Sequence, residues 1–124
     1  MIGALLIAAA VGVVAGAAIA HFWKNIVQWL NKVFAKVKQV IQRTVVGVQT
    51  FLRRDSGGYR NMSYNYSKLD NGNYRRDTVV ETEYVDESDV PEEFVRRMQA
   101  MNLSQTETTD ELQRQLDTLQ LQNA

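Results

Sequence analysis

The chain has 124 residues, no cysteine, and fourteen basic and fourteen acidic side chains, so its formal net charge is zero. The lack of cysteine excludes disulfides, thiolate metal sites and a cysteine nucleophile, and the length allows one small domain. The charge is divided unevenly, because residues 1–54 hold seven bases and no acid while residues 55–124 hold all the acids. This division predicts two environments, with the basic half facing an anionic surface.

Residues 2–20 contain no charged or strongly polar side chain. A helix of about 20 apolar residues crosses the hydrocarbon core of a bilayer. His21, Trp23 and Lys24 follow, which is typical of a membrane interface. We therefore predict a transmembrane helix over residues 1–23. Because bases follow this span and none precedes it, we expect a single-pass protein of the inner membrane, with the N-terminus outside and the C-terminus in the cytoplasm.

Small residues recur every four positions along this segment and form one ridge of a helix: Ala4, Ala8, Gly12, Gly16 and Ala20. Helices associate in lipid where small residues let their backbones approach, so the ridge predicts a helix-packing face and a homo-oligomer. An alternative is a cleaved leader of a secreted protein, because residues 18–20 have the small-x-small form of a signal-peptidase site.

Residues 24–54 contain neither proline nor an acid, and apolar residues recur at three heptad positions. This pattern predicts a basic amphipathic helix that continues the span. Three arrangements fit it: flat on a bilayer with anionic headgroups, bundled with copies of itself, or packed as core on the C-terminal domain. The residues expected at the membrane interface are His21, Trp23, Lys24, Trp29, Lys32, Lys36 and Lys38.

Residues 55–101 are expected to form a small cytosolic domain that contains a β-hairpin. Asn71-Gly72 lies between two runs rich in Tyr, Val and Thr, and both residues tolerate the positive φ of a tight turn. A two-residue loop there pairs Leu69 with Tyr74 and Tyr64 with Val79. The face that this register makes apolar consists of Met62, Tyr64, Tyr66 and Val79.

The hairpin is rich in tyrosine, and an alternative interpretation is a platform on which nucleobases stack. Four bases lie near these tyrosines, but four acids lie on the same hairpin, so we do not expect nucleic acid as a partner. The residues concerned are Tyr59, Tyr64, Tyr66, Tyr74 and Tyr84, the bases Arg60, Lys68, Arg75 and Arg76, and the acids Asp70, Asp77, Glu81 and Glu83.

Two further helices are predicted after the hairpin. Asp89, Pro91 and Glu92 have the pattern of a helix start, and Phe94 and Met98 lie on one apolar face of the segment that follows. Residues 102–124 form a polar tail whose thin leucine stripe predicts a short helix, either disordered or paired with a partner. The fold class is then an α+β membrane protein: one transmembrane helix, a basic amphipathic helix, a hairpin and one or two short helices.

The sequence does not predict an enzyme, and we assign no catalytic, cofactor-binding or metal-binding residue, since no second histidine and no cysteine accompany His21. The layout is similar to that of small bacterial membrane effectors, including those of anti-phage defence and toxin systems, and to that of phage holins. The function expected from it is a self-associating protein that perturbs or permeabilises the inner membrane. The alternative is a membrane scaffold that presents its acidic domain to a cytosolic protein partner, which would be contacted through residues 86–124.

Overall fold

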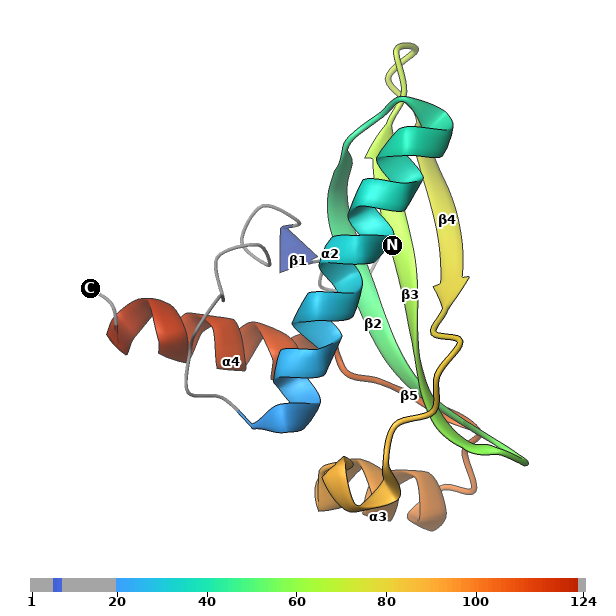
Figure 1. The fold of residues 1–124 in the computed structure, drawn as a ribbon, viewed down its shortest axis with the longest axis vertical. Helices are drawn as coiled ribbons and strands as arrows, with labels where there is room; N and C mark the ends of the chain where they lie inside the picture. Colours follow the sequence, from blue (N-terminus) through green and yellow to red (C-terminus); the bar gives the residue numbers. More distant parts are fainter. Residues whose placement is uncertain (1–5, 8–19, 123–124) are drawn as a thin grey trace.

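The structure is a computed structural model that describes residues 6–7 and 20–122, with residues 6–7 and 118–122 described by their backbone. Its strands form one antiparallel sheet, and its helices pack beside this sheet (Figure 1). In chain order they are β1 (Leu6–Ile7), α2 (His21–Ile41), β2 (Val45–Asp55), β3 (Gly58–Lys68), β4 (Tyr74–Val80), the 3-10 turn η1 (Glu87–Asp89), α3 (Glu92–Ala100), β5 (Gln105–Glu107) and α4 (Thr109–Gln122).

The sheet is built on the meander β2–β3–β4. Strand β2 pairs with β3 from Val45 opposite Ser67 to Asp55 opposite Gly58. On the other edge of β2, β1 pairs with residues 47–48 and β5 with residues 51–53. Strand β4 therefore ends the sheet on its side, with no further strand beside it in the part of the chain that the structure describes.

Helix α2 lies along one face of this sheet, which we call the helix face (Figure 1). Its buried residues recur three and four positions apart, so they form a single stripe. The part of the stripe from Phe22 to Leu30 shares one core with Leu52 of β2, Phe94 of α3 and Leu112 of α4, and Val33 and Val37 form a second cluster with Val45 of β2. The third of the three predicted arrangements, packing as core, is therefore the one observed. The stripe consists of Phe22, Trp23, Ile26, Val27, Leu30, Val33 and Val37.

The predicted helix over residues 24–54 is wrong after Ile41. Helix α2 ends at Ile41, where Gln42 adopts a left-handed conformation with φ 57° and its N–H donates to the carbonyl of Lys38. Residues 45–55 form β2 instead, because the stretch begins with β-branched residues and its backbone groups pair with β3. Val40, on the predicted apolar stripe, is 72% exposed.

The predicted transmembrane helix over residues 1–23 is also contradicted. The backbone of Leu6–Ile7 pairs with β2 as a strand, inside the range that the span would occupy. Among residues 6–7 and 20–122, no helix combines the length and apolar character needed to cross a bilayer. The membrane fold class and the single-pass, inner-membrane localisation are therefore corrected to a small α+β fold, in which the apolar stripe of α2 packs on the protein's own sheet.

Most of the predicted small-residue ridge (Ala4, Ala8, Gly12 and Gly16) lies outside the described residues. Ala20 precedes α2 with φ −56° and ψ 147°, so it is not part of a helix.

The predicted hairpin is confirmed as β3 and β4, but its register differs by one residue. The N–H of Leu69 donates to the carbonyl of Asn73, which closes a three-residue loop in place of the expected two-residue loop. Tyr64 consequently pairs with Thr78, and Val79 pairs with Ser63. A shift of one residue moves a side chain to the opposite face, so Val79 packs on the helix face, away from Tyr64.

The two short helices are present. Helix α3 starts near the predicted position, although Pro91 is its N-cap and no side chain caps it, so the predicted capping bond between Asp89 and Glu92 does not form. The tail forms α4, and its Leu112 and Leu116 are buried in the main core. The tail residues up to Leu116 are therefore part of the domain.

Candidate functional site

A groove separates the first half of α2 from the chain that follows β4. The N–H of Glu81 donates to the carbonyl of Asn61, and the N–H of Val85 donates to that of Tyr59. Three residues thus lie between these two bonds on one strand and only Arg60 on the other. Such a bulge bends the chain away from its partner strand. Residues 81–89 therefore leave the sheet beside α2.

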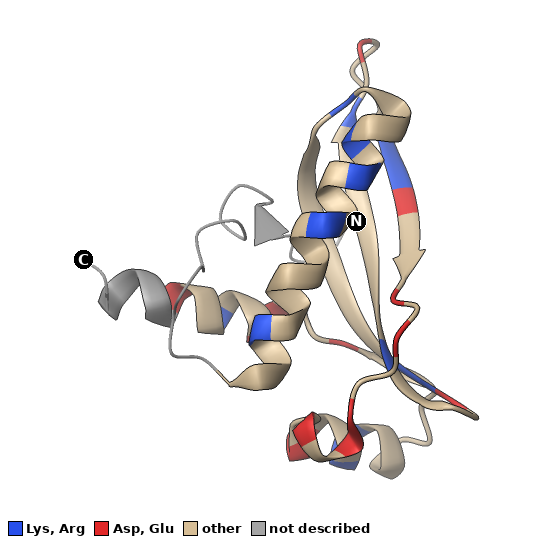
Figure 2. Ribbon diagram, viewed as in Figure 1, with Lys and Arg blue, Asp and Glu red and all other residues tan. Residues whose placement is uncertain are grey.

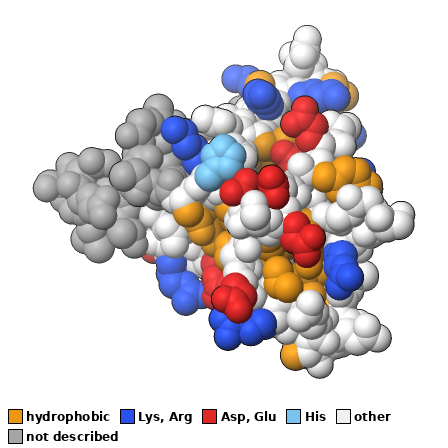
Figure 3. Space-filling model, turned by 60° about the horizontal axis from the view of Figure 1, so that its bottom comes forward, with side chains coloured by type: hydrophobic (Ala, Val, Ile, Leu, Met, Phe, Trp, Pro, Cys, Tyr) orange, Lys and Arg blue, Asp and Glu red, His pale blue; other side chains and the backbone are white. Residues whose placement is uncertain are grey.

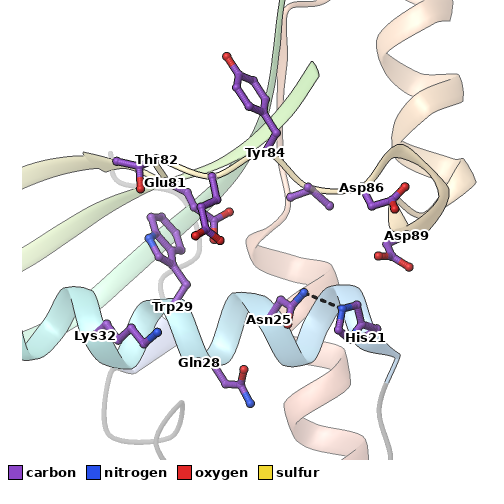
Figure 4. A pocket seen from close by; sticks show the side chains of 12 residues that line it. His21, Asn25, Gln28, Trp29, Lys32, Glu81, Thr82, Tyr84, Asp86 and Asp89 are labelled. Atoms are coloured by element: carbon purple, nitrogen blue, oxygen red, sulfur yellow. Dashed lines mark hydrogen bonds between the residues drawn. The ribbon is translucent and has the colours of Figure 1, made fainter. Parts of the chain in front are cut away.

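The groove has a cavity volume of about 600 Å³, within the range of about 300–1,000 Å³ that is common for ligand pockets. Figure 4 shows its two walls, with Trp29 extending from α2 toward Glu81. Helix α2 contributes His21, Asn25, Gln28, Trp29 and Lys32, and the other wall contributes Glu81, Thr82, Glu83, Tyr84, Val85, Asp86 and Asp89.

The walls of the groove carry an excess of negative charge. Four carboxylates line it (Glu81, Glu83, Asp86 and Asp89), against one lysine and one histidine. Figure 3 shows the histidine beside acidic side chains around a hollow in which hydrophobic side chains are visible. Clustered charges of one sign in a cleft focus the field and attract ligands of the opposite sign.

Glu81 directly follows β4 and is only partly exposed. Burial raises its pKa above the ordinary value, although the amide of Asn61 donates to its Oε1 over 3.1 Å, and the neighbouring Glu83 raises the pKa further. Burial disfavours the ionised form, so a nearby positive charge would stabilise this carboxylate.

Asp86 lies at the other end of the same wall, and its pKa is shifted in the opposite direction from that of Glu81. The backbone N–H of Ser88 and its hydroxyl both donate to Oδ1 of Asp86, at 3.0 and 2.9 Å. These bonds lower the pKa of Asp86, so it stays ionised. They also fix the start of η1, which carries Asp89 into the groove.

The outer rim is formed by Tyr84, whose ring lies 5.0 Å from the guanidinium of Arg60 and directly beside Gly57. At the α2 end of the groove, Nδ2 of Asn25 lies 3.0 Å from Nε2 of His21. No group of three or more metal-ligating side chains gathers among the residues that the structure describes. The arrangement is suited to binding a cation between an aromatic ring and carboxylates.

A second hollow of about 200 Å³ continues the groove between α2 and β4. It shares Trp29, Lys32 and Thr82 with the first, and its remaining lining is mainly aliphatic, from Val33, Val37, Val79 and Val80, together with Lys36. The gap beside β4 thus has an acidic end and an aliphatic end.

The structure separates the residues that were predicted to lie at a membrane interface. His21, Trp29 and Lys32 line the groove, and Lys36 lines its aliphatic end. Trp23 is 5% exposed in the core, and Lys24 and Lys38 lie on the exposed side of α2. The carboxylates of the opposite wall were attributed to an exposed strand and a helix start. The signal for them was the acidic run that continues past the end of β4.

The tyrosines of the hairpin do not share one face. Tyr59 is buried in the main core on the helix face. On the far face, the ring centroids of Tyr64 and Phe51 lie 4.8 Å apart, and the guanidinium carbon of Arg76 lies 4.5 Å from the ring centroid of Tyr64. The described residues thus provide no single row of stacked tyrosines like the one considered for nucleobases.

No protein-family model, no curated protein and no solved structure matches the chain.

Proposed function

We propose that this protein is a non-catalytic binding module whose acidic groove binds a basic segment of a protein partner. The observation that carries the proposal is that Trp29 and the half-buried Glu81 line the same groove, in which carboxylates outnumber bases. Membrane permeabilisation, the first function expected from the sequence, was argued from the transmembrane span over residues 1–23, and the strand pairing of Leu6–Ile7 contradicts that span. The alternative was a membrane scaffold that presents an acidic domain to a partner; the present proposal keeps its acidic binding surface and leaves out its membrane anchor.

The physical argument starts at Glu81. A carboxylate whose pKa is raised by burial is destabilised when it is ionised at neutral pH. A guanidinium or ammonium group beside it offsets that cost, and the indole of Trp29 offers the same cation a favourable π face. Glu83, Asp86 and Asp89 then attract the basic segment and set its orientation.

The proposal is tested with a hexa-arginine peptide and Trp fluorescence as the readout. Trp29 lines the groove, whereas Trp23 is buried in the core, so a change on binding reports mainly Trp29. We expect saturable binding that weakens as salt is raised, and none with the same peptide made of the uncharged analogue citrulline.

Matched variants assign the binding to the groove. Glu81→Gln/Glu83→Gln removes two carboxylates that line it, while Glu92→Gln/Glu93→Gln removes two exposed carboxylates of α3 that do not. We expect the first double variant to lose roughly tenfold or more in affinity and the second to bind nearly as the wild type. Equal losses in both variants, or no binding by the wild type, would refute the proposed function.

A further inference from the structure

We infer that the basic segment is supplied by a second copy of this chain, whose β4 pairs antiparallel with β4 and places Arg75 beside Glu81 of the first copy. This inference rests on the proposed function, because it names the partner of the same groove. It gives the protein a dimer with one continuous sheet.

The first support is the open edge of the sheet. Strand β4 pairs with β3 on one side and with no described strand on the other. The bonds from Glu81 to Asn61 and from Leu69 to Asn73 place the odd-numbered residues of β4 in hydrogen-bonded pairs with β3. Because bonding alternates along an antiparallel strand, the backbone groups of Arg76 and Thr78 point away from β3, and both residues are exposed.

The second support is the direction of charge along this strand. Arg75 and Arg76 stand at its start, and Glu81 and Glu83 follow its end. Figure 2 shows the change from basic to acidic residues along this edge. Antiparallel pairing of two copies places the start of each strand against the end of the other, so the edge is complementary to itself.

The third support is the register. Residues that face each other across an antiparallel pair lie on the same face, so the two-fold axis must pass beside one residue and its own copy. An axis at Arg76 or Asp77 sets that residue against itself, and an axis at Val79 sets Asp77 against Glu81. Like charges directly opposite each other are destabilising, so these three registers are disfavoured.

An axis at Thr78 is the register among these four that brings no like charges together. It sets Arg75 opposite Glu81, Arg76 opposite Val80, and Asp77 opposite Val79. Arg75 already lies on the helix face, where its guanidinium bonds to Asp77 at 3.1 Å. The neighbouring strand would lie about 4.8 Å away, so this guanidinium reaches the acidic end of the groove.

Cysteine crosslinking tests the register. The chain contains no cysteine, so a single introduced cysteine can only link two copies. Thr78→Cys would lie about 5.5 Å from its copy, within the range that a disulfide spans. We expect it to form disulfide dimers rapidly. Val46→Cys, at a residue that is 46% exposed on β2, should not. Arg76→Cys mixed with Val80→Cys should link only as the mixture.

Charge exchange tests the partner. We expect Arg75→Glu to weaken the dimer roughly tenfold in dissociation constant, because the two-fold axis repeats each pair. The double variant Arg75→Glu/Glu81→Arg should recover dimerisation. Thr78→Pro should also abolish it, since it removes an N–H that points away from β3 and leaves the β3–β4 bonds in place. Circular dichroism and thermal unfolding serve as the controls that test whether each variant is folded.

Sedimentation and crosslinking together decide the outcome. A chain that stays monomeric at high concentration, and whose Thr78→Cys links no faster than Val46→Cys, overturns the second copy as partner. If hexa-arginine still binds such a monomer, the proposed function stands with a different partner. If dimers form through β4 but the Glu81→Gln/Glu83→Gln variant dimerises as well as the wild type, the edge pairing holds and the groove's role in it is refuted.

Discussion

Phe94 joins α3 to the N-terminal half of α2, and Phe94→Ala tests whether α2 is core. The side chain of Phe94 is 0% exposed. Its ring centroid lies 6.1 Å from that of Phe22 and 5.8 Å from that of Trp23. A helix that lay on a bilayer or bundled elsewhere would not need these contacts, whereas a core helix loses them when Phe94 is truncated.

The expected loss follows from buried area and cavity formation. A buried phenylalanine removes about 150 Å² or more of apolar surface from water, which at about 25 cal/mol per Å² is close to 4 kcal/mol. Measured truncations of buried phenylalanine to alanine cost about 3–5 kcal/mol. We therefore expect Phe94→Ala to lower the free energy of unfolding by about 3–4 kcal/mol.

Urea unfolding followed by circular dichroism measures this loss, and Trp emission shows where it acts. Trp23 should move to longer emission wavelengths as its T-shaped contact with Phe94 is lost. Met101→Ala is the control in the same segment, because Met101 is 66% exposed and should change stability by no more than about 0.5 kcal/mol. A loss below about 1 kcal/mol in Phe94→Ala, with unchanged Trp emission, would refute the assignment of α2 to the core.

Three further predictions concern single positions. Because burial raises the pKa of Glu81 in the folded protein, this carboxyl loses its proton at a lower pH in the unfolded chain, near pH 4.5. Raising the pH through this range therefore favours the unfolded chain and lowers stability until the folded pKa is passed. Glu81→Gln should accordingly be more stabilising at about pH 7 than at about pH 4, as measured by urea unfolding. Gln42→Gly should stabilise the protein by about 0.5–1 kcal/mol, because glycine adopts φ 57° without strain, and Asn102→Gly, at φ 51°, should gain less since asparagine tolerates this region. Gly57→Ala places a Cβ 2.4 Å from the ring of Tyr84, so it should displace that ring and change the affinity for hexa-arginine, as measured by fluorescence titration.

The sequence predicted the features whose cause is local. Asn71-Gly72 marks a turn through its own backbone preferences, and the hairpin was found there. Its register was missed because the loop closes between Leu69 and Asn73 and so has three residues, one more than the two-residue loop that was expected. That single residue placed Val79 on the wrong face. Loop width depends on how the strands twist and pack, which a local pattern does not contain.

The apolar stripe of α2 was found, but its surroundings were not. Periodicity shows that one side of a helix is apolar, and both a bilayer and a protein core satisfy that side. Val48, Leu52, Phe94 and Leu112, which cover it here, come from three elements far apart in the sequence. The boundary after Ile41 was missed because the apolar heptad positions continue into β2 as Val48 and Phe51, where pairing with β3 decides the conformation.

The groove could not be predicted, because its walls lie about fifty residues or more apart in the sequence and meet only through the bulge after Glu81. The division of charge was visible from the start and was assigned to two environments, with the basic half facing an anionic surface. In the structure the acidic residues that follow β4 lie beside the basic helix α2, where they form the other wall of the groove (Figure 2). Arg75 at the start of β4 and Glu81 directly after its end repeat this polarity along one edge of the sheet. When two such edges run antiparallel, the basic start of each lies beside the acidic end of the other. The charge distribution along β4 is therefore itself a reason to expect antiparallel pairing between copies.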